Sequence, residues 1–299
     1  MISGIINVYK EKGFTSHDVV AKMRGILRQK KIGHTGTLDP DAEGVLPVCL
    51  GAGTKLCDML TDTGKTYRAV LLLGQTTDTQ DTSGTVLSTA PVNCSVEQVK
   101  EAVMSFLGEY DQIPPMYSAL KVQGKKLYEL ARAGVEVERA ARRVLIHNIE
   151  IEKIELPEVT FTVSCSKGTY IRTLCYDIGE KLGCGGCMKS LMRIQVGSFN
   201  IEDSLKLSEI EMLRDEERLA EYIVPVDQMF PELLQTHVLP EFDKLIKNGN
   251  PMKSKQLKEM PDPSVHERIR VYDCQGTFCG IFQWDSRKKY FMPEKMFLN

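Results

Sequence analysis

The residues of this chain that could do chemistry begin with Asp39, which lies in the run GHTGTLDPDAEG from Gly33 to Gly44. Pro40 restricts the residue before it to extended backbone geometry, so the direction of the Asp39 side chain is set locally. A carboxyl group with an ordinary pKa of about 3.9 is ionised at neutral pH and can act as a base or a nucleophile. The run therefore predicts a fixed, reactive carboxylate between two glycine turns.

Three other interpretations of the same run stay open at the level of the residues. Asp followed by Pro is typical of a helix N-cap with proline in the first helical position, so Asp39 could begin a helix instead. Asp41 or Glu43 could equally be the reactive acid. Two carboxylates also suit glycoside hydrolysis, which depends on a separation between them that the sequence does not give.

Basic residues gather directly before this run. From Val19 to Leu38 the chain has no acid and five basic residues, which are Lys22, Arg24, Arg28, Lys30 and Lys31. Two further acid-free segments, 113–128 and 244–258, contain three and five lysines, although the formal net charge is only −2. One lysine-rich segment is usually a solvated surface, but three segregated basic faces favour phosphate contacts and therefore a polyanionic substrate.

The elements that must position these residues show clear periodicity. Helices with one apolar face are expected after three N-caps, which are Ser16, Ser95 (with Gln98 completing a capping box) and Thr169. Strands are expected over residues 67–73 and 159–165, and a hairpin over residues 268–284. Residues 113–124 read as a loop and 125–133 as a short helix. Strands and helices without regular alternation predict an α+β fold.

Length and composition favour a two-domain enzyme. The chain has 299 residues, of which 42% are hydrophobic and 26% charged, and no apolar run approaches the roughly 18 residues that span a bilayer. No leader is recognisable at the N-terminus, so we expect a cytoplasmic protein with its nine cysteines reduced. Cys184 and Cys187 have CxxC spacing, which leaves a metal or redox role open beside a glycine-rich surface turn.

Six motifs, in the same order along the chain, resemble the TruB family of tRNA pseudouridine synthases. They are residues 4–16 (GIINVYKEKGFTS), 33–44, 65–69 (KTYRA), 74–81 (GQTTDTQD), 114–121 (PPMYSALK) and 168–172 (GTYIR). The resemblance covers roughly the first 200 residues and is weaker in the tail, which resembles a PUA-type RNA-binding domain. The usual Leu-Arg-Arg-Thr of the family is Leu191-Met192-Arg193-Ile194 here, so one charge and one hydroxyl differ.

The resemblance implies a role for each matching residue. Asp39 would be the catalytic aspartate, attacking either the sugar C1′ or the base of a flipped-out uridine, and Arg172 would pair with it. Tyr67 would stack on the base and serve in proton transfer, Tyr170 and Leu191 would line the pocket, and His34 would fill the gap in the RNA stack. The expected RNA contacts are Lys10, Lys22, Arg28, Lys31, Lys55, Lys121, Lys125 and Lys126. No cofactor or metal is implied.

The resemblance also implies an architecture and a substrate. Residues 1–232 would form a catalytic domain with a mixed, mainly antiparallel sheet flanked by helices, and 233–299 a small β-rich PUA-like domain. A loop at about 113–143 would be a mobile clamp over the RNA. The expected reaction is isomerisation of uridine 55 in the T loop of tRNA, by a monomer without membrane or obligatory protein partner. A noncatalytic tRNA-binding protein and a guide-RNA-dependent relative remain as alternatives.

Overall fold

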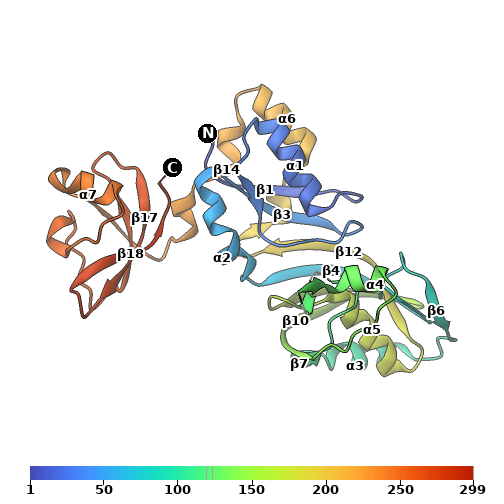
Figure 1. The fold of residues 1–299 in the computed structure, drawn as a ribbon. Coiled ribbons are helices and arrows are strands. Elements are labelled where there is room, and N and C mark those ends of the chain that lie inside the picture. The colour runs from blue at the N-terminus through green and yellow to red at the C-terminus, as the bar shows by residue number, and fades with distance from the viewer. Residues whose placement is uncertain (119, 123, 299) are drawn as a thin grey trace.

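A ten-stranded sheet forms the larger of two lobes in the computed structural model, which describes residues 1–118, 120–122 and 124–298 (Figure 1). Along the sheet the strands are β14 (Ile223–Val224), β1 (Gly4–Lys10), β3 (Glu43–Leu50), β12 (Gly186–Val196), β4 (Lys65–Leu73), β11 (Glu158–Cys165), β10 (Arg142–Glu155) and β7 (Gly108–Gln112). Two short strands, β2 (Ile32–His34) and β13 (Phe199–Asn200), pair with β3 and β12. Every pairing is antiparallel except that of β3 with β12, so the sheet is mixed but mainly antiparallel, as predicted.

Two separate helix pairs cover the two halves of this sheet. Helices α1 (Ser16–Leu27) and α6 (Leu207–Asp215) pack with β1 and β3 in one apolar cluster. Helices α3 (Val96–Met104) and α5 (Ile171–Leu182) pack with β4, β10 and β11 in another. In β4 and β11 buried residues alternate with more exposed ones, which is the period-two pattern that predicted these strands. The α+β fold expected from the sequence is thereby confirmed.

The remaining short elements connect the sheet strands. A small hairpin consists of β5 (Gln75–Thr77) and β6 (Val86–Thr89), and α2 (Cys57–Thr61) precedes β4. Short 3₁₀ helices occur at Gly51–Leu56, Ile201–Asp203, Leu219–Tyr222, Val226–Met229, Pro240–Phe242 and Ser254–Gln256. No helix in the described ranges is both long and apolar enough to cross a membrane.

Two of the three expected helix caps are wrong by one residue. Thr15, not Ser16, is the N-cap of α1, and it forms a capping box with Asp18. Tyr170, not Thr169, is the N-cap of α5, and it makes no side-chain hydrogen bond there. The capping box of Ser95 and Gln98 is confirmed at the start of α3. Both errors lie beside functional residues, where tertiary contacts compete with local capping.

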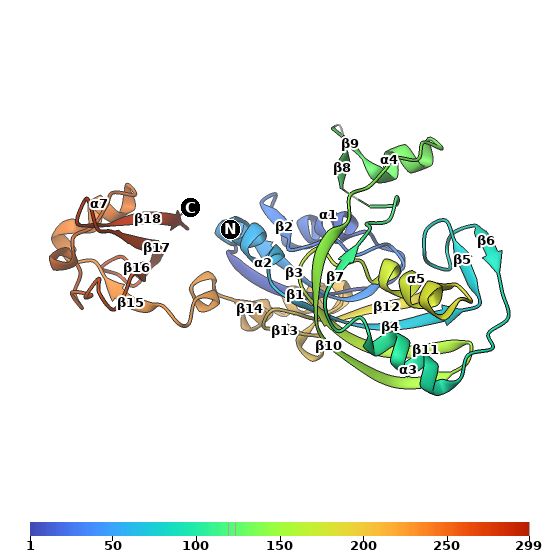
Figure 2. The same cartoon turned by 90° about the horizontal axis from the view of Figure 1, so that it is seen from below.

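A long excursion of the chain, which we term the thumb segment (residues 113–141), connects β7 to β10 (Figure 2). Its two flanking residues, Gln112 and Arg142, are cross-strand partners, so the excursion begins and ends at the same point of the sheet. It contains a two-residue ladder of β8 (Lys121–Val122) with β9 (Lys125–Lys126), followed by α4 (Leu127–Arg132). The expected uninterrupted loop to residue 124 is therefore wrong, and the helix begins two residues later than predicted.

A separate four-stranded sheet forms the smaller lobe. It consists of β15 (Leu234–His237), β16 (Arg268–Tyr272), β17 (Phe278–Asp285) and β18 (Tyr290–Met296), with α7 (Asp243–Lys247) beside it. The predicted hairpin is confirmed as β16 and β17. The lobe has its own apolar cluster, yet Ile281 and Phe297 pack instead with Leu56 and Phe230 of the larger lobe. Lys55 Nζ adds a hydrogen bond to the Met296 carbonyl at 2.7 Å, so the two lobes are joined by packing and by polar contacts.

Candidate active site

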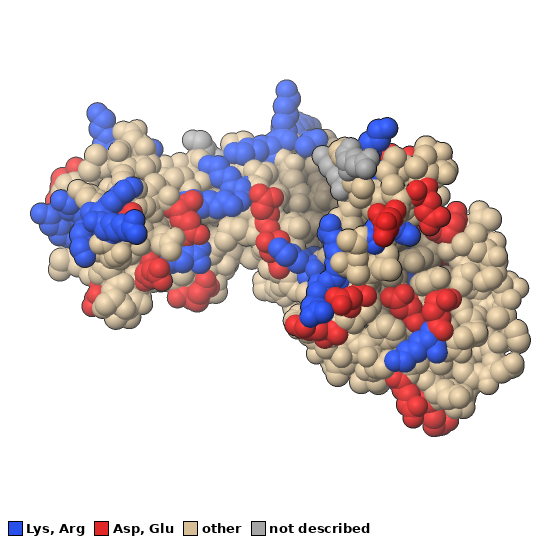
Figure 3. Space-filling view, turned by 60° about the horizontal axis from the view of Figure 1, so that its bottom comes forward, with Lys and Arg blue, Asp and Glu red and all other residues tan. Residues whose placement is uncertain are grey.

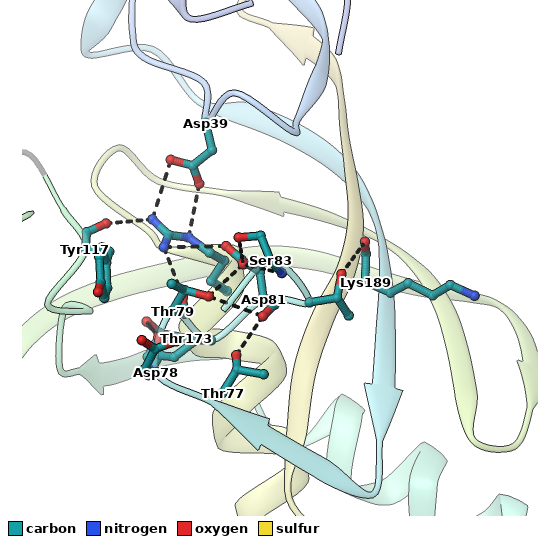
Figure 4. A network of polar contacts seen from close by, with 12 residues as sticks. Asp39, Thr77, Asp78, Thr79, Asp81, Ser83, Tyr117, Thr173 and Lys189 are labelled. Atoms are coloured by element: carbon teal, nitrogen blue, oxygen red, sulfur yellow. Dashed lines mark hydrogen bonds and ion pairs between the residues drawn. The ribbon is translucent and has the colours of Figure 1, made fainter. Parts of the chain in front are cut away.

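Asp39 lies in a turn between β2 and β3, at a cavity of about 1160 Å³ in the larger lobe. The Ala42 N–H donates to the Asp39 carbonyl at 3.1 Å, and the segment does not continue into a helix. The helix-cap interpretation of Asp39 is therefore wrong. Because no helix follows, the Asp39 side chain is not occupied with capping and projects towards the cavity (Figure 4).

Buried polar groups fix the backbone on both sides of Asp39. The Leu38 N–H donates to the buried hydroxyl of Ser16 at 2.9 Å, which ties the turn to the start of α1. Lys10 Nζ donates to the carbonyls of Pro40 at 3.1 Å and Ala42 at 2.5 Å. These bonds satisfy main-chain groups that a tight turn leaves without ladder partners.

Lys10 is consequently an anchor of this turn and not an RNA contact. Its side chain is fully buried, and burial lowers the pKa of its ammonium group to about 8. A phosphate cannot reach a lysine whose donors point at carbonyls inside the fold. The predicted RNA-binding role of Lys10 is corrected on that ground.

Arg172, in the first turn of α5, meets Asp39 across the cavity. Its Nε lies 3.0 Å from Asp39 Oδ2, and its Nη2 lies 3.5 Å from Asp39 Oδ1. The same guanidinium donates to the carbonyls of Thr79 at 3.0 Å and Tyr117 at 2.8 Å (Figure 4). Arg172 therefore connects the Asp39 turn, the loop after β5 and the thumb segment at one point.

A second carboxylate, Asp81, belongs to this network. Its Oδ2 lies 3.7 Å from Arg172 Nη1, and its Oδ1 accepts hydrogen bonds from the hydroxyls of Thr79 and Ser83. Asp41 is exposed, and Glu43 accepts a hydrogen bond from the Tyr9 hydroxyl at 3.4 Å. Of the three acids in the 33–44 run, Asp39 alone is paired with Arg172 in the described structure.

Opposing effects set the acidity of Asp39. Burial raises the pKa of its carboxyl above the usual range, Arg172 lowers it, and the nearby Asp81 raises it again. The side chain of Arg172 is 7% exposed and that of Asp39 is 42% exposed. The pair is thus open to a ligand on the carboxylate side and closed on the guanidinium side.

Tyr67, Tyr170 and Leu191 line the same cavity, as the resemblance implies. Tyr67 is buried on β4, and Leu191 lies on the neighbouring strand β12. The backbone of Tyr170 is fixed by Gln112, whose side chain accepts from the Tyr170 N–H at 2.8 Å and donates to its carbonyl at 3.0 Å. Two aromatic rings and an aliphatic side chain thus surround the space beside Asp39, which suits a planar base.

His34 lies apart from these residues. It does not line the cavity, and its ring packs edge-on against His17 of α1, with centroids 5.3 Å apart. Burial lowers the pKa of His34, and His17 lowers it further. In this arrangement His34 is a neighbour of the Asp39 turn and not part of the cavity wall.

The other expected RNA-binding residues differ in how accessible they are. Lys22, Arg28, Lys31 and Lys125 are exposed, Lys126 is half-buried, and Lys55 is committed to the contact between the lobes. The side chain of Lys121 lies outside the described part of the chain. Figure 3 shows Lys and Arg side chains on both lobes of one face. Basic residues that the sequence did not single out also line the cavity, among them Lys12, Arg132, Arg142, Arg143, Lys167 and Lys189.

The CxxC pair lies at the glycine-rich turn between α5 and β12, where Gly183 is exposed. Cys184 and Cys187 are both buried, and Gly185 between them has a φ of +72°. Among the described residues no group of three or more His, Cys, Asp or Glu side chains could bind a metal ion.

Asp81 and Arg193 are site residues to which the sequence assigned no role. Asp81 ends a quoted motif, but nothing local indicates that it faces Arg172, which is 91 positions away. Arg193 was noted only as the retained half of an altered motif. It lines the cavity and is almost fully buried, a combination that only the strand register reveals.

Comparisons with known proteins agree with this geometry. A family model described as TruB family pseudouridylate synthase (N terminal domain) matches residues 24–171, and one described as tRNA pseudouridylate synthase B C-terminal domain matches residues 172–231. The chain is 53% identical to the tRNA pseudouridine synthase B of Lachnoclostridium phytofermentans, over 99% of this chain and 100% of that protein. It is 47% identical to the tRNA pseudouridine synthase B of Alkaliphilus oremlandii, over 97% and 96%.

Solved structures extend the similarity to the whole fold. A Cbf5-Nop10-Gar1 complex contains a chain with a TM-score of 0.71 and 25% identity, covering 99% of this chain and 85% of that one. An H/ACA RNP bound to a substrate RNA containing 2′-deoxyuridine gives a TM-score of 0.70 at 23% identity, with the same coverage. Both lobes are therefore included in the shared architecture.

Proposed function

The chain belongs to the TruB family of tRNA pseudouridine synthases, and from that premise we propose that it isomerises uridine 55 in the T loop of tRNA with Asp39 as the attacking group. Conversion of uridine to pseudouridine in tRNA is the reaction that the names of its curated relatives describe. The observation that supports the residue assignment most is the ion pair of Asp39 with the buried Arg172, at the mouth of a cavity lined by Tyr67, Tyr170 and Leu191.

The reaction requires one bond to break and one to form. The N1–C1′ glycosidic bond breaks, the uracil turns within the cavity, and C5 bonds to C1′, while one proton leaves C5 and one is gained at N1. Substrate and product are isomers, so no oxidant or group donor enters. Asp39 attacks either C1′ or the base, and in both cases it must be ionised first.

The roles of the neighbouring residues follow from their contacts. Arg172 fixes the direction of the Asp39 carboxylate with two donors, which reduces the rearrangement needed to reach the transition state. Tyr67 stacks on the flipped base, and its hydroxyl takes part in the proton transfer from C5. Tyr170 and Leu191 close the pocket around the ring.

The test measures tritium release from tRNA that carries uridine labelled at C5. We expect Asp39→Asn to lower the single-turnover rate by at least about a thousandfold, because the amide cannot act as the nucleophile. Asp41→Asn is the matched control, since Asp41 is an exposed acid of the same turn, and its rate should stay within about threefold of wild type.

Each outcome of this assay decides one assignment. No release by the wild-type protein would contradict the activity itself and favour a noncatalytic tRNA-binding protein. Release that persists in Asp39→Asn would contradict the choice of nucleophile. A T-arm stem-loop with cytidine in place of uridine 55 should release nothing from other labelled positions, which tests the site.

We also propose the division of labour between the lobes. Residues 1–232 form the catalytic domain, in which the thumb segment clamps the RNA, and 233–299 form a PUA-like RNA-binding domain. The separate sheet and apolar cluster of the smaller lobe support this division. We expect the protein to work in the cytoplasm as a monomer, without an obligatory partner.

Activity on naked tRNA separates this proposal from a guide-dependent enzyme. The structural similarity to chains from ribonucleoprotein complexes concerns the fold, whereas the far higher identity is to proteins named for tRNA. Turnover by the purified chain, without guide RNA or accessory protein, is the expected result. Light scattering of the same sample reports whether it is a monomer.

A further inference from the structure

Arg193 is a buried cation that the proposed mechanism does not yet use. Its side chain, on β12, is 1% exposed, and its guanidinium donates through Nε to the Val45 carbonyl at 2.8 Å and through Nη2 to the Gly36 carbonyl at 3.4 Å. Among the described residues no carboxylate pairs with Arg193, and Tyr67 is the only side chain that stabilises its charge. A buried charge without a carboxylate partner is costly, so a function beyond packing is expected of it.

The strand register brings Arg193 to Tyr67. The two residues are direct cross-strand partners in the antiparallel pair of β12 and β4, so their side chains leave the same face of the sheet. Both line the cavity beside Asp39, and both are almost entirely buried. A guanidinium donor and a phenol oxygen are thereby adjacent at the floor of the site.

The charge of Arg193 acts on Tyr67 in a definite direction. Burial raises the pKa of the Tyr67 hydroxyl, and Arg193 is the principal group that lowers it again. Burial in turn lowers the pKa of Arg193, while Tyr67 raises it. Each residue thus favours the polar or charged form of the other in a site that water reaches poorly.

We propose that Arg193 is a positioning residue for the reaction, which orients the Tyr67 hydroxyl and ties it, through the Gly36 carbonyl, to the turn that carries Asp39. The inference rests on the proposed contact of Tyr67 with the target base. It connects two groups that the reaction needs in a fixed relation, one on β4 and one between β2 and β3. In this proposal Arg193 acts through Tyr67 and the Asp39 turn, and not by direct contact with the base or the sugar.

The guanidinium geometry explains why an arginine stands at this place. Its planar fork donates in several directions at once, and here it reaches the Val45 carbonyl on β3 and the Gly36 carbonyl in the loop before it, while Tyr67 lies beside it across the strand pair. A lysine has a single nitrogen on a flexible side chain, so it could donate to only some of these groups at once. An uncharged side chain would leave the Gly36 carbonyl without this donor.

The experiment uses the full-length protein and a T-arm stem-loop with C5-labelled uridine. We expect Arg193→Gln to lower the single-turnover rate by about 30-fold or more, with the Kd for the RNA within about threefold of wild type. The single-turnover rate of Arg193→Lys should lie between those of wild type and Arg193→Gln. Arg68→Gln is the matched control, because Arg68 is an arginine of the neighbouring β4 that pairs with Glu152 at the surface, and its rate should be unchanged.

A double-mutant cycle with Tyr67→Phe separates positioning from a purely structural effect. Because Arg193 acts through the Tyr67 hydroxyl, Arg193→Gln should cost much less in the Tyr67→Phe background than in wild type. Equal cost in both backgrounds would overturn the proposal. So would a rate for Arg193→Gln within about threefold of wild type, or a loss that appears wholly in Kd.

An NMR measurement tests the same contact if Arg193→Gln does not fold. Tyr67→Phe leaves Arg193 in place and removes only a hydroxyl, so the side-chain ¹⁵N resonance of Arg193, assigned through Arg193→Lys, should shift between wild type and Tyr67→Phe. An unmoved resonance would contradict the contact. This arm needs no turnover, so it remains informative even if the wild-type protein forms no pseudouridine, a result that would overturn the proposed function instead.

Discussion

The Asp39–Arg172 pair makes the acid limb of the pH–rate profile a direct readout of the site. Asp39 must be ionised to attack, and because burial raises the pKa of its carboxyl, activity falls with decreasing pH earlier than it would for a free aspartate. Arg172 lowers that pKa, so Arg172→Gln removes a stabilising cation and moves the limb to higher pH. It should also lower the rate at neutral pH by at least about 100-fold, since the carboxylate loses its orientation.

Removing the charge of Asp81 should shift the acid limb of the pH–rate profile in the direction opposite to that of Arg172→Gln. Its negative charge raises the pKa of Asp39, so Asp81→Asn is expected to move the acid limb to lower pH. Single-turnover rates between pH 4.5 and about 8 measure both shifts with one substrate, in a range that brackets a raised carboxyl pKa. Limbs that move in the same direction in the two variants would contradict the electrostatic account of the site.

Contacts between individual site residues were predictable from the sequence only where both residues belong to motifs that match the family. Arg172 was paired with Asp39 by the match of residues 168–172 to the family motif, and the two side chains do form an ion pair. The burial of Lys10 under the Asp39 turn reversed its predicted role. Arg193 was missed because its neighbour Tyr67 lies 126 positions earlier and only the register of β4 and β12 brings them together.

Among the elements, β3 and β12 pair closely where Gly44 lies opposite Arg193. This pairing fixes the position of β3 directly after the turn that carries Asp39. Gly44 has a φ of +104°, and a Cβ at this position would collide with the Arg193 carbonyl. Gly44→Ala should therefore lower the free energy of unfolding by at least about 2 kcal/mol, through strain and lost strand contact. Urea denaturation monitored by circular dichroism measures this change in the free energy of unfolding.

Gly25 provides the control for that substitution. It lies inside α1, a Cβ at this position would meet no other atom within 4 Å, and its backbone has no left-handed φ. Gly25→Ala should raise the free energy of unfolding by about 0.5–1 kcal/mol, because alanine restricts the unfolded chain and favours helix. Equal effects of the two substitutions would show that close approach at Gly44 is unimportant.

Helix starts and turns near the site are decided by hydrogen bonds to residues far along the chain, against the local sequence pattern. Thr15 and Ser16 are both good N-caps, and the choice falls on Thr15 because the Ser16 hydroxyl accepts the N–H of Leu38 instead. The Asp39–Pro40 pair has the local form of a helix start, but Lys10 takes the carbonyls that a helix would use. Strands β4 and β11 were predictable since their alternation is local, whereas these turns depend on partners far along the chain.

Over the whole molecule, the distribution of charge predicts how binding depends on salt. Lys255 and Lys258 are exposed on the smaller lobe, while Lys247 is engaged with Asp243 at 2.6 Å. If the smaller lobe contacts RNA phosphates, each of Lys255→Gln and Lys258→Gln should reduce the slope of log Kd against log salt by about 1, without changing the chemical step. Lys100→Gln, on the larger lobe in α3, is the control and should leave the slope unchanged.

Fold class and order of elements were within reach of the sequence, but the joining of the lobes was not. The two-lobed plan follows from the length and composition of the chain. The packing of Phe297 and Ile281 on Phe230 and Leu56 joins residues from opposite ends of the chain, and nothing in their spacing indicates it. Lys55 illustrates the consequence, because a lysine assigned to RNA instead donates to the last strand of the protein.

The thumb segment leaves and re-enters the sheet at one rung of the ladder, where Gln112 faces Arg142. Its closure is therefore secured by strand pairing, and lengthening it costs free energy only with the logarithm of its length, about 0.6 kcal/mol for each doubling. Insertions and deletions beyond Ser118, which keep the Tyr117 carbonyl in place as an acceptor for Arg172, leave Asp39, Tyr67 and Arg172 at their positions on their own elements. The reach of the protein around an RNA can thus diversify in evolution, or be redesigned, independently of the chemistry that it performs.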